Sequence, residues 1–185
     1  ATETIRKALA MGATNATHIV VDEIAALDSF ALSNLLAAHL KGHKYDVILT
    51  GKQSQDSDAG LAGGMLAELL GLPFATNAVG MRAVENILEV TRQGDTGQEK
   101  LEMITPCLVT CSNDMNNPRI PSLKGIMGAK RTVITTTQGA PGITRTVVTR
   151  TSPPSAREAG IQFEGEPEEI VALLVNKLQA EAGVF

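Results

Sequence analysis

Hydrophobic positions along the chain follow two alternating spacings, which predict alternating helices and strands. Apolar residues recur at the spacing of amphipathic helices over residues 1–13, 30–40, 61–70 and 168–178, and a short helix is expected around 122–130. Short apolar, β-branched runs typical of buried strands occupy residues 18–22, 46–50, 107–111 and 132–137. Alternation of this kind predicts an α/β fold, an open parallel sheet with flanking helices on both faces.

The pattern changes after Pro73. Residues 78–84, 87–91 and 100–104 alternate apolar and polar positions around glycine turns, so an antiparallel meander is expected as an insertion. After Gln138 the composition shifts to Gly, Pro, Ser, Thr and Arg until the final helix. We therefore expect an α/β domain over 1–137, followed by an extended C-terminal arm with a terminal helix over 138–185.

The beginning of the chain differs from an ordinary α/β domain, because a helix and not a strand comes first. Such a domain normally opens with its central strand, and no strand precedes the helix that starts near Ala1. We therefore expect the α/β domain to be N-terminally incomplete.

Composition excludes several classes of function. The net charge is −4, aromatic residues make up 3% and tryptophan is absent, so a nucleic-acid surface is not expected. No run of about 18 apolar residues could insert into a membrane. Cys107 and Cys111 lie in one expected strand, too far apart to form a disulfide, and no secretory signal opens the chain. A soluble protein of a reducing compartment, the cytoplasm or an organelle matrix, is expected.

The densest chemical signal is the segment from Asp46 to Met65. A buried strand leads into a polar loop that ends in Gly60, Ala62 and Gly63 at the start of a helix. Small residues there let backbone N–H groups approach an anion, and the helix dipole favours a phosphate. Close packing of the helix on the sheet explains the same small residues equally well. The loop is neither a G-x-G-x-x-G nor a P-loop motif, so phosphoryl transfer is not expected.

Three separated motifs together resemble the β subunit of electron transfer flavoprotein. They are ALAMGA at 8–13, GKQSQDSDAGLAGGMLAELLGLP at 51–73 and NPRIPSLKGIMGAK at 117–130, in the order and spacing of that family. The resemblance implies an adenine-nucleotide α-hydrolase-like fold and pairing with an FAD-carrying α subunit. It also implies that the heterodimer carries electrons from flavin dehydrogenases, such as acyl-CoA dehydrogenases, to a membrane quinone reductase or another acceptor. The compartment would then be the bacterial cytoplasm or the mitochondrial matrix.

The resemblance also implies two sites and no catalytic residue. An AMP would be bound by the loop residues Gly51, Gln53, Asp56, Asp58, Ala59, Gly60, Leu61, Ala62 and Gly63. Flavin dehydrogenases would dock on Ile120, Pro121, Ser122, Leu123, Ile126 and Met127, with Leu123 as the hydrophobic anchor. The family commonly has Asn, Gln and Thr at positions 60 to 62, so here only backbone donors are available at these positions. From helix periodicity alone, Ile126 and Met127 are expected to form the buried face of a short helix.

Other readings stay open beside this one. In electron-bifurcating relatives the same pocket holds a second FAD, and universal-stress-type nucleotide-binding proteins share the strand, loop and helix. Asp56 and Asp58 are an acid pair, Mg²⁺ ligands or, as we expect, helix caps. The two cysteines are expected to be core residues and not redox thiols. The three histidines lie on separate expected elements, so no metal site is expected.

Overall fold

The computed structural model describes residues 1–22, 27–113, 115–140, 142–157 and 159–183. The chain divides into two compact units, Ala1–Val147 and Val148–Phe185, which are described separately. The segment 138–147 thus belongs to the first unit, whereas the sequence assigned it to the arm.

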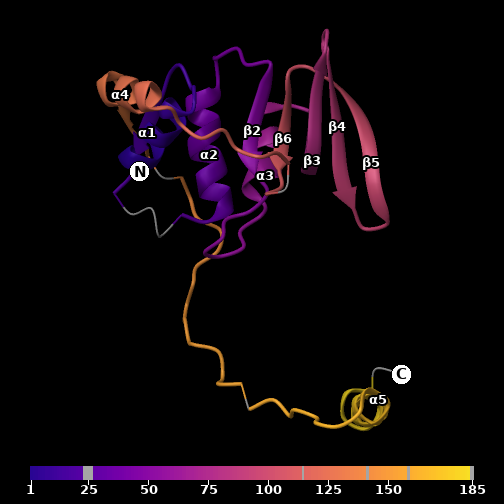
Figure 1. Ribbon diagram of the computed structural model, residues 1–185. Coiled ribbons are helices and arrows are strands. Elements are labelled where there is room, and N and C mark those ends of the chain that lie inside the picture. The colour runs from indigo at the N-terminus through magenta and orange to yellow at the C-terminus, as the bar shows by residue number, and fades with distance from the viewer. Residues whose placement is uncertain (23–26, 114, 141, 158, 184–185) are drawn as a thin grey trace. The chain divides into compact units, whose positions relative to one another are not determined.

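The order of helices and strands agrees with the sequence prediction. The elements of the first unit are α1 (Thr2–Ala10), β1 (Thr17–Val20), α2 (Ser29–Leu40), β2 (Val47–Gly51), α3 (Ala62–Leu70), β3 (Phe74–Val84), β4 (Ile87–Gly94), β5 (Gly97–Ile104), β6 (Cys107–Cys111), α4 (Leu123–Arg131) and β7 (Thr135–Gln138) (Figure 1). The second unit contains α5 (Pro167–Lys177) and a π-helical turn, η2 (Leu178–Ala182).

Local signals set the ends of the helices. The Asp28 carboxylate accepts a hydrogen bond from the Ala31 N–H at 2.8 Å and caps α2. The Ser122 hydroxyl accepts one from the Gly125 N–H at 3.1 Å and caps α4. Helix α3 ends at Gly71 in the left-handed conformation (φ 66°), which glycine adopts without steric cost.

The strands form a mixed sheet in the order β2-β6-β3-β4-β5. Strand β6 pairs in parallel with β2 and with the first half of β3, and antiparallel pairing joins β3, β4 and β5. The register between β3 and β6 shifts between Ala75 and Ala78, where Asn77 has a positive φ of 58°. The parallel strands and the inserted meander are therefore both confirmed.

The parallel strands do not form one continuous sheet. Strand β1 pairs only with β7, in a separate two-stranded parallel sheet, although helix α2 connects β1 directly to β2. Among the described residues, the parallel strands are thus divided between two sheets.

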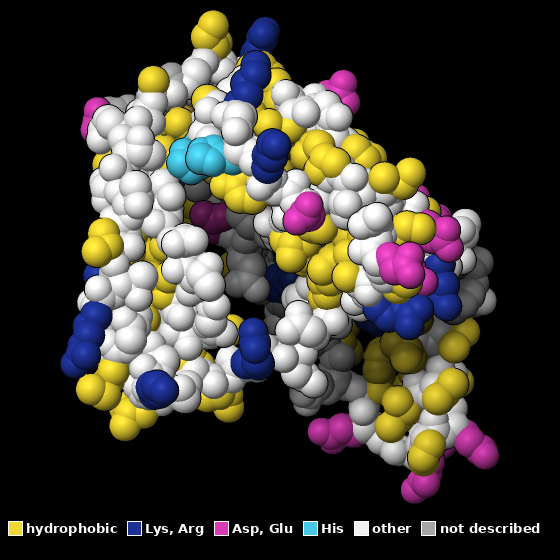
Figure 2. Space-filling view, turned by 90° about the horizontal axis from the view of Figure 1, so that it is seen from above, with side chains coloured by type: hydrophobic (Ala, Val, Ile, Leu, Met, Phe, Trp, Pro, Cys, Tyr) yellow, Lys and Arg dark blue, Asp and Glu magenta, His cyan; other side chains and the backbone are white. Residues whose placement is uncertain are grey.

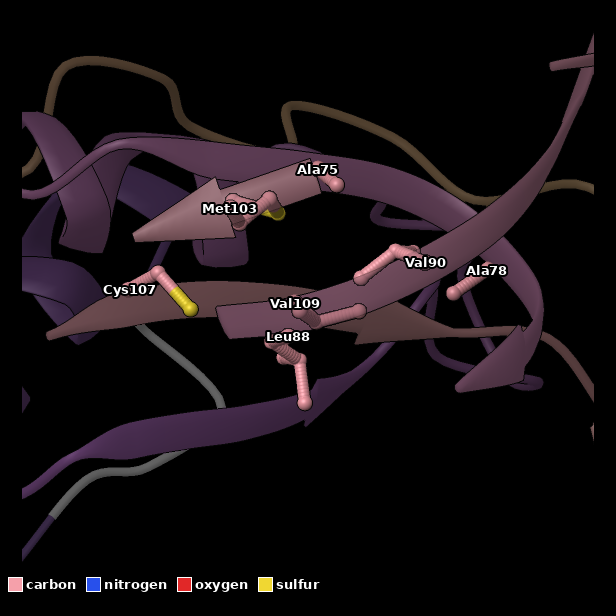
Figure 3. Close-up of a cluster of buried hydrophobic side chains, with 7 residues drawn as sticks. All are labelled: Ala75, Ala78, Leu88, Val90, Met103, Cys107 and Val109. Carbon is pink, nitrogen blue, oxygen red and sulfur yellow. The ribbon is translucent and has the colours of Figure 1, made fainter. Parts of the chain in front are cut away.

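Two apolar clusters cover opposite faces of β6. Leu108 packs with Leu66 and Ala67 of α3 and Ala37 of α2 on one face. On the other face, Cys107 and Val109 pack with side chains of β3, β4 and β5 (Figure 3). On this face the packing partners of β6 come from other strands of the same sheet. Burial raises the pKa of the Cys107 and Cys111 thiols, in accordance with a core role.

The second unit is an extended segment followed by α5. None of the side chains of α5 is buried, and its apolar residues Val171, Leu174 and Val175 are 58%, 44% and 37% exposed. The amphipathic helix predicted from the sequence is thus present, and its apolar face is uncovered within its own unit.

Candidate functional site

The loop between β2 and α3 encloses a small cavity at the carboxyl end of β2. The cavity has a volume of about 220 Å³ and is lined by Leu36, Thr50, Gly51, Lys52, Gln53, Ser54, Ala59, Ala62, Gly63 and Leu66. Ligand sites in open α/β folds lie at this end of parallel strands. Pockets that enclose a whole drug-sized ligand are typically about 300–1,000 Å³. This cavity therefore has room for part of a nucleotide, such as its phosphate end.

Hydrogen bonds between residues of the β2–α3 loop stabilise its conformation. Gln53 donates to the Asp58 carboxylate at 3.0 Å, and the hydroxyls of Ser54 and Ser57 lie 2.9 Å apart. Ala59 N–H donates to the Ser54 hydroxyl at 3.2 Å, and the Ser54 N–H donates to the Ala59 carbonyl oxygen, also at 3.2 Å. Hydrogen bonds from Ser54, from the backbone and from Ser57 lower the pKa of the Asp56 carboxyl.

Asp56 and Asp58 do not cap the following helix, so that expectation is wrong. The N-cap position of α3 is Leu61, which makes no side-chain capping hydrogen bond. The two carboxylates instead accept hydrogen bonds from Ser57 and Gln53 inside the loop. The first N–H groups of α3 thus have no side-chain acceptor, and together with the helix dipole they favour an anion at this helix start.

A second polar group at the cavity has no partner. The Thr50 hydroxyl is buried and makes no hydrogen bond in the structure. Buried hydroxyls are normally paired, because an unpaired one costs about 1–3 kcal/mol. An oxygen-rich ligand group in the cavity would give both Thr50 and the start of α3 a partner. The residues present therefore fit the phosphate end of a nucleotide.

Gly63 serves close packing between α3 and the sheet. A Cβ atom at this position would lie 2.6 Å from both Thr110 Cγ2 and Thr50 Oγ1. At Gly60 the nearest atom to such a Cβ is the Lys52 carbonyl oxygen at 3.5 Å, an ordinary contact. Of the two explanations that the sequence left open, the geometry supports packing at Gly63.

The structure brings together only part of the site that the sequence suggested. Gly51, Gln53, Ala59, Ala62 and Gly63 line the cavity, whereas the other four suggested residues are not among its lining residues: Asp56, Asp58, Gly60 and Leu61. Sequence reasoning missed Thr50, Lys52 and Ser54. A polar residue at the end of an otherwise apolar strand was the signal that could have identified Thr50.

The suggested docking segment presents apolar side chains to the exterior of its unit. Ile120 is 93% exposed and Leu123 is 75% exposed. Ile126 and Met127 are 42% and 52% exposed, so the expectation that they form the buried face of α4 is wrong. Small residues form that face instead, and Ala129 is buried. Hydrophobic side chains also reach the surface in several other places (Figure 2), so exposure alone does not identify a docking surface.

The described residues hold neither a group of three or more metal-ligating side chains nor a helix long and apolar enough to cross a bilayer. The fold is an α/β fold with a polar loop and a small cavity at the carboxyl end of β2. Residues 1–141 match the family model described as "Electron transfer flavoprotein domain". The chain belongs to the electron transfer flavoprotein family.

Three relatives show how the chain compares with longer proteins. The electron transfer flavoprotein subunit beta of Syntrophomonas wolfei is 34% identical over 91% of this chain and 66% of its own length. The human protein of the same name is 36% identical over 93% of this chain and 69% of its own length. The "Caffeyl-CoA reductase-Etf complex subunit CarD" of Acetobacterium woodii is 33% identical over 97% and 73%. The chain thus spans about two thirds to three quarters of the length of these relatives. Because the family is established, the alternative of a universal-stress-type nucleotide-binding protein is set aside.

Proposed function

We propose that this chain acts as the β subunit of an electron transfer flavoprotein. In this role it pairs with an α subunit that carries FAD, binds AMP in the β2–α3 loop and docks flavin dehydrogenases through Leu123. The heterodimer carries electrons from those dehydrogenases, such as acyl-CoA dehydrogenases, to a membrane quinone reductase or another acceptor. It works in the bacterial cytoplasm or the mitochondrial matrix. The observation that carries the proposal is the family match over residues 1–141, which includes all three motifs.

The residues of this chain bind and position, and no side chain takes part in a reaction. FAD, when bound mainly by the α subunit, supplies the electron chemistry. The start of α3 and the Thr50 hydroxyl hold the phosphate of AMP, which has a structural role. The cavity of about 220 Å³ would hold the phosphate end of AMP and not the whole nucleotide.

The uncovered face of α5 supports pairing with an α subunit. Val171 and Leu174 are 58% and 44% exposed on a helix with no buried side chain. An apolar helix face of this kind is typical of a segment that is buried in a partner. The second unit is thus well suited to contribute to the heterodimer interface.

A second candidate keeps the family and changes the ligand. The resemblance to a subunit of the Caffeyl-CoA reductase-Etf complex favours a bifurcating flavoprotein, in which FAD takes the place of AMP in the loop site. The number of flavins per heterodimer separates the two candidates. One flavin supports AMP in the loop, and two support the second candidate.

The docking role is tested with Leu123→Ala in the heterodimer. A single exposed leucine that enters a partner pocket can supply about 2 kcal/mol, so KM for the heterodimer in dehydrogenase assays should rise roughly tenfold or more. Ile104→Ala is the matched control, because Ile104 and Leu123 are both 75% exposed. An equal response of the two variants would refute the docking role of Leu123.

A further inference from the structure

Helix α4, which carries the exposed Leu123, packs against helix α1. The two helices lie next to each other in Figure 1, although more than a hundred residues separate them in the sequence. Two of the three family motifs meet here, since α1 ends within ALAMGA and α4 contains LKGIMGAK. The contact between them has no part in the nucleotide site.

The backbones of the two helices approach each other closely at Gly125. A Cβ at this position would lie 2.6 Å from the carbonyl oxygen of Ala10 at the end of α1. Backbone atoms cannot rotate away as a side chain can, so any larger residue must shift one helix. A Cβ at Gly128, three residues further along the same helix, would meet nothing within 4 Å.

The other end of α4 is held by Arg6 of α1. The half-buried Arg6 guanidinium donates a hydrogen bond to the Ala129 carbonyl oxygen and one at 3.3 Å to that of Thr132. These carbonyl groups lie at the C-terminal end of α4, where a cation also interacts favourably with the helix dipole. Arg6 and Ala10 are four residues apart, about one helical turn. Their contacts on α4, Ala129 and Gly125, are also four residues apart, so the two contacts match one turn of each helix.

This packing determines which face of α4 is exposed. Gly125 and Ala129 face α1, and Ile126 and Met127 are left 42% and 52% exposed beside Leu123. We propose that α1 is the platform that positions the docking helix, and that Arg6 and Gly125 are positioning residues for dehydrogenase docking. The inference rests on the proposed function, because it assumes that Leu123 docks a dehydrogenase.

The main test compares Gly125→Ala with Gly128→Ala in the heterodimer. Both changes add one methyl group to the same helix, and only the first meets the backbone of α1. Gly125→Ala should raise KM for the heterodimer in dehydrogenase assays about fivefold or more, with kcat at saturation unchanged. Backbone amides of residues 126–132 should exchange hydrogen faster in Gly125→Ala than in the unmodified protein. In Gly128→Ala their exchange rates should be unchanged.

A second pair of variants tests the other contact. Arg6→Ala should raise KM and hydrogen exchange in the same way. Arg6→Lys should restore part of both, because lysine keeps the positive charge but does not reproduce the two hydrogen bonds that Arg6 Nη1 donates to these carbonyls. Bound flavin and nucleotide should stay at wild-type levels in every variant, since the contact lies outside the nucleotide site.

The outcomes separate this inference from the function on which it rests. If both Leu123→Ala and Gly125→Ala raise KM, the positioning role is supported. If Leu123→Ala raises KM and Gly125→Ala behaves like Gly128→Ala in KM and exchange, the platform is refuted and the docking function stands. If Leu123→Ala leaves KM unchanged, the docking function fails, and the positioning role fails with it.

Discussion

Substitution of Gly63 by alanine tests how α3 is placed beside the nucleotide site. The added methyl carbon would lie 2.6 Å from Thr110 Cγ2 and from Thr50 Oγ1. The Thr110 side chain is held in its rotamer, because its hydroxyl accepts a hydrogen bond from the Asn77 N–H at 3.0 Å. Relief of the clash therefore requires α3 to move away from β6.

The expected magnitude follows from two opposing effects. Insertion of a methyl group into a packed contact costs about 1–3 kcal/mol. Alanine in place of glycine inside a helix returns up to about 1 kcal/mol. Gly63→Ala should therefore lower the free energy of unfolding by about 1 kcal/mol or more, roughly fivefold in the folding equilibrium.

Urea unfolding measures this effect, and far-UV circular dichroism is the suitable signal because the chain has no tryptophan and one tyrosine. Gly60→Ala is the matched control, since its Cβ would lie 3.5 Å from the nearest atom and its effect should stay within about 0.5 kcal/mol. Equal stability of the two variants would refute the packing argument. If Gly63→Ala were then found to lose only AMP binding, the glycine would serve ligand approach instead.

Three further predictions concern the first unit's C-terminal segment, α5 and the cysteines. The Asp28 carboxylate accepts hydrogen bonds from the N–H groups of Arg145 and Thr146 at 2.6 and 2.8 Å, so Asp28→Ala should speed tryptic cleavage after Arg145, measured by mass spectrometry. Hydrogen bonds from Ala31, Arg145 and Thr146 lower the pKa of Asp28 from 3.8 to about 2. Because the folded pKa is the lower one, the hydrogen bonds from Arg145 and Thr146 to Asp28 should hold this segment fully above pH 3.8 and be lost as the pH falls toward 2. Hydrogen exchange of the Arg145 and Thr146 amides at acidic pH can follow this loss. Leu174→Asp should abolish copurification with the α subunit while leaving the circular dichroism spectrum unchanged, and unchanged copurification would count against the role of α5. Cys107 is fully buried with a raised thiol pKa, so it should react with a thiol reagent only after unfolding, and rapid labelling of the native protein would contradict its core assignment.

The sequence predicted the elements of the fold because their signals are local. Helical spacing, the Asp28 and Ser122 caps and the glycine after α3 each act within a few residues. The division of the parallel strands into two sheets was not predicted. Strand pairing depends on which edges lie side by side, and the run of β-branched residues in β1 gives no information about its neighbour.

The candidate site was only partly predictable for a related reason. The loop after β2 could be found because small residues at a helix start have a known use in phosphate binding. Which of its residues line the cavity depends on hydrogen bonds inside the loop, such as that between Gln53 and Asp58. The exposure of Ile126 and Met127 follows from the close approach of α1 to Gly125, a contact between distant parts of the sequence. Helix periodicity cannot predict it, because glycine and alanine give no strong hydrophobic signal.

The central claim is that the chain is half of a two-protein electron carrier with a nucleotide held at the end of β2. Its most direct test is mass spectrometry of the purified heterodimer, first native and then after release of the small molecules. We expect one copy of this chain, one α subunit, one FAD and one AMP. A chain that purifies without an α subunit, and with neither flavin nor adenine nucleotide, would contradict the claim.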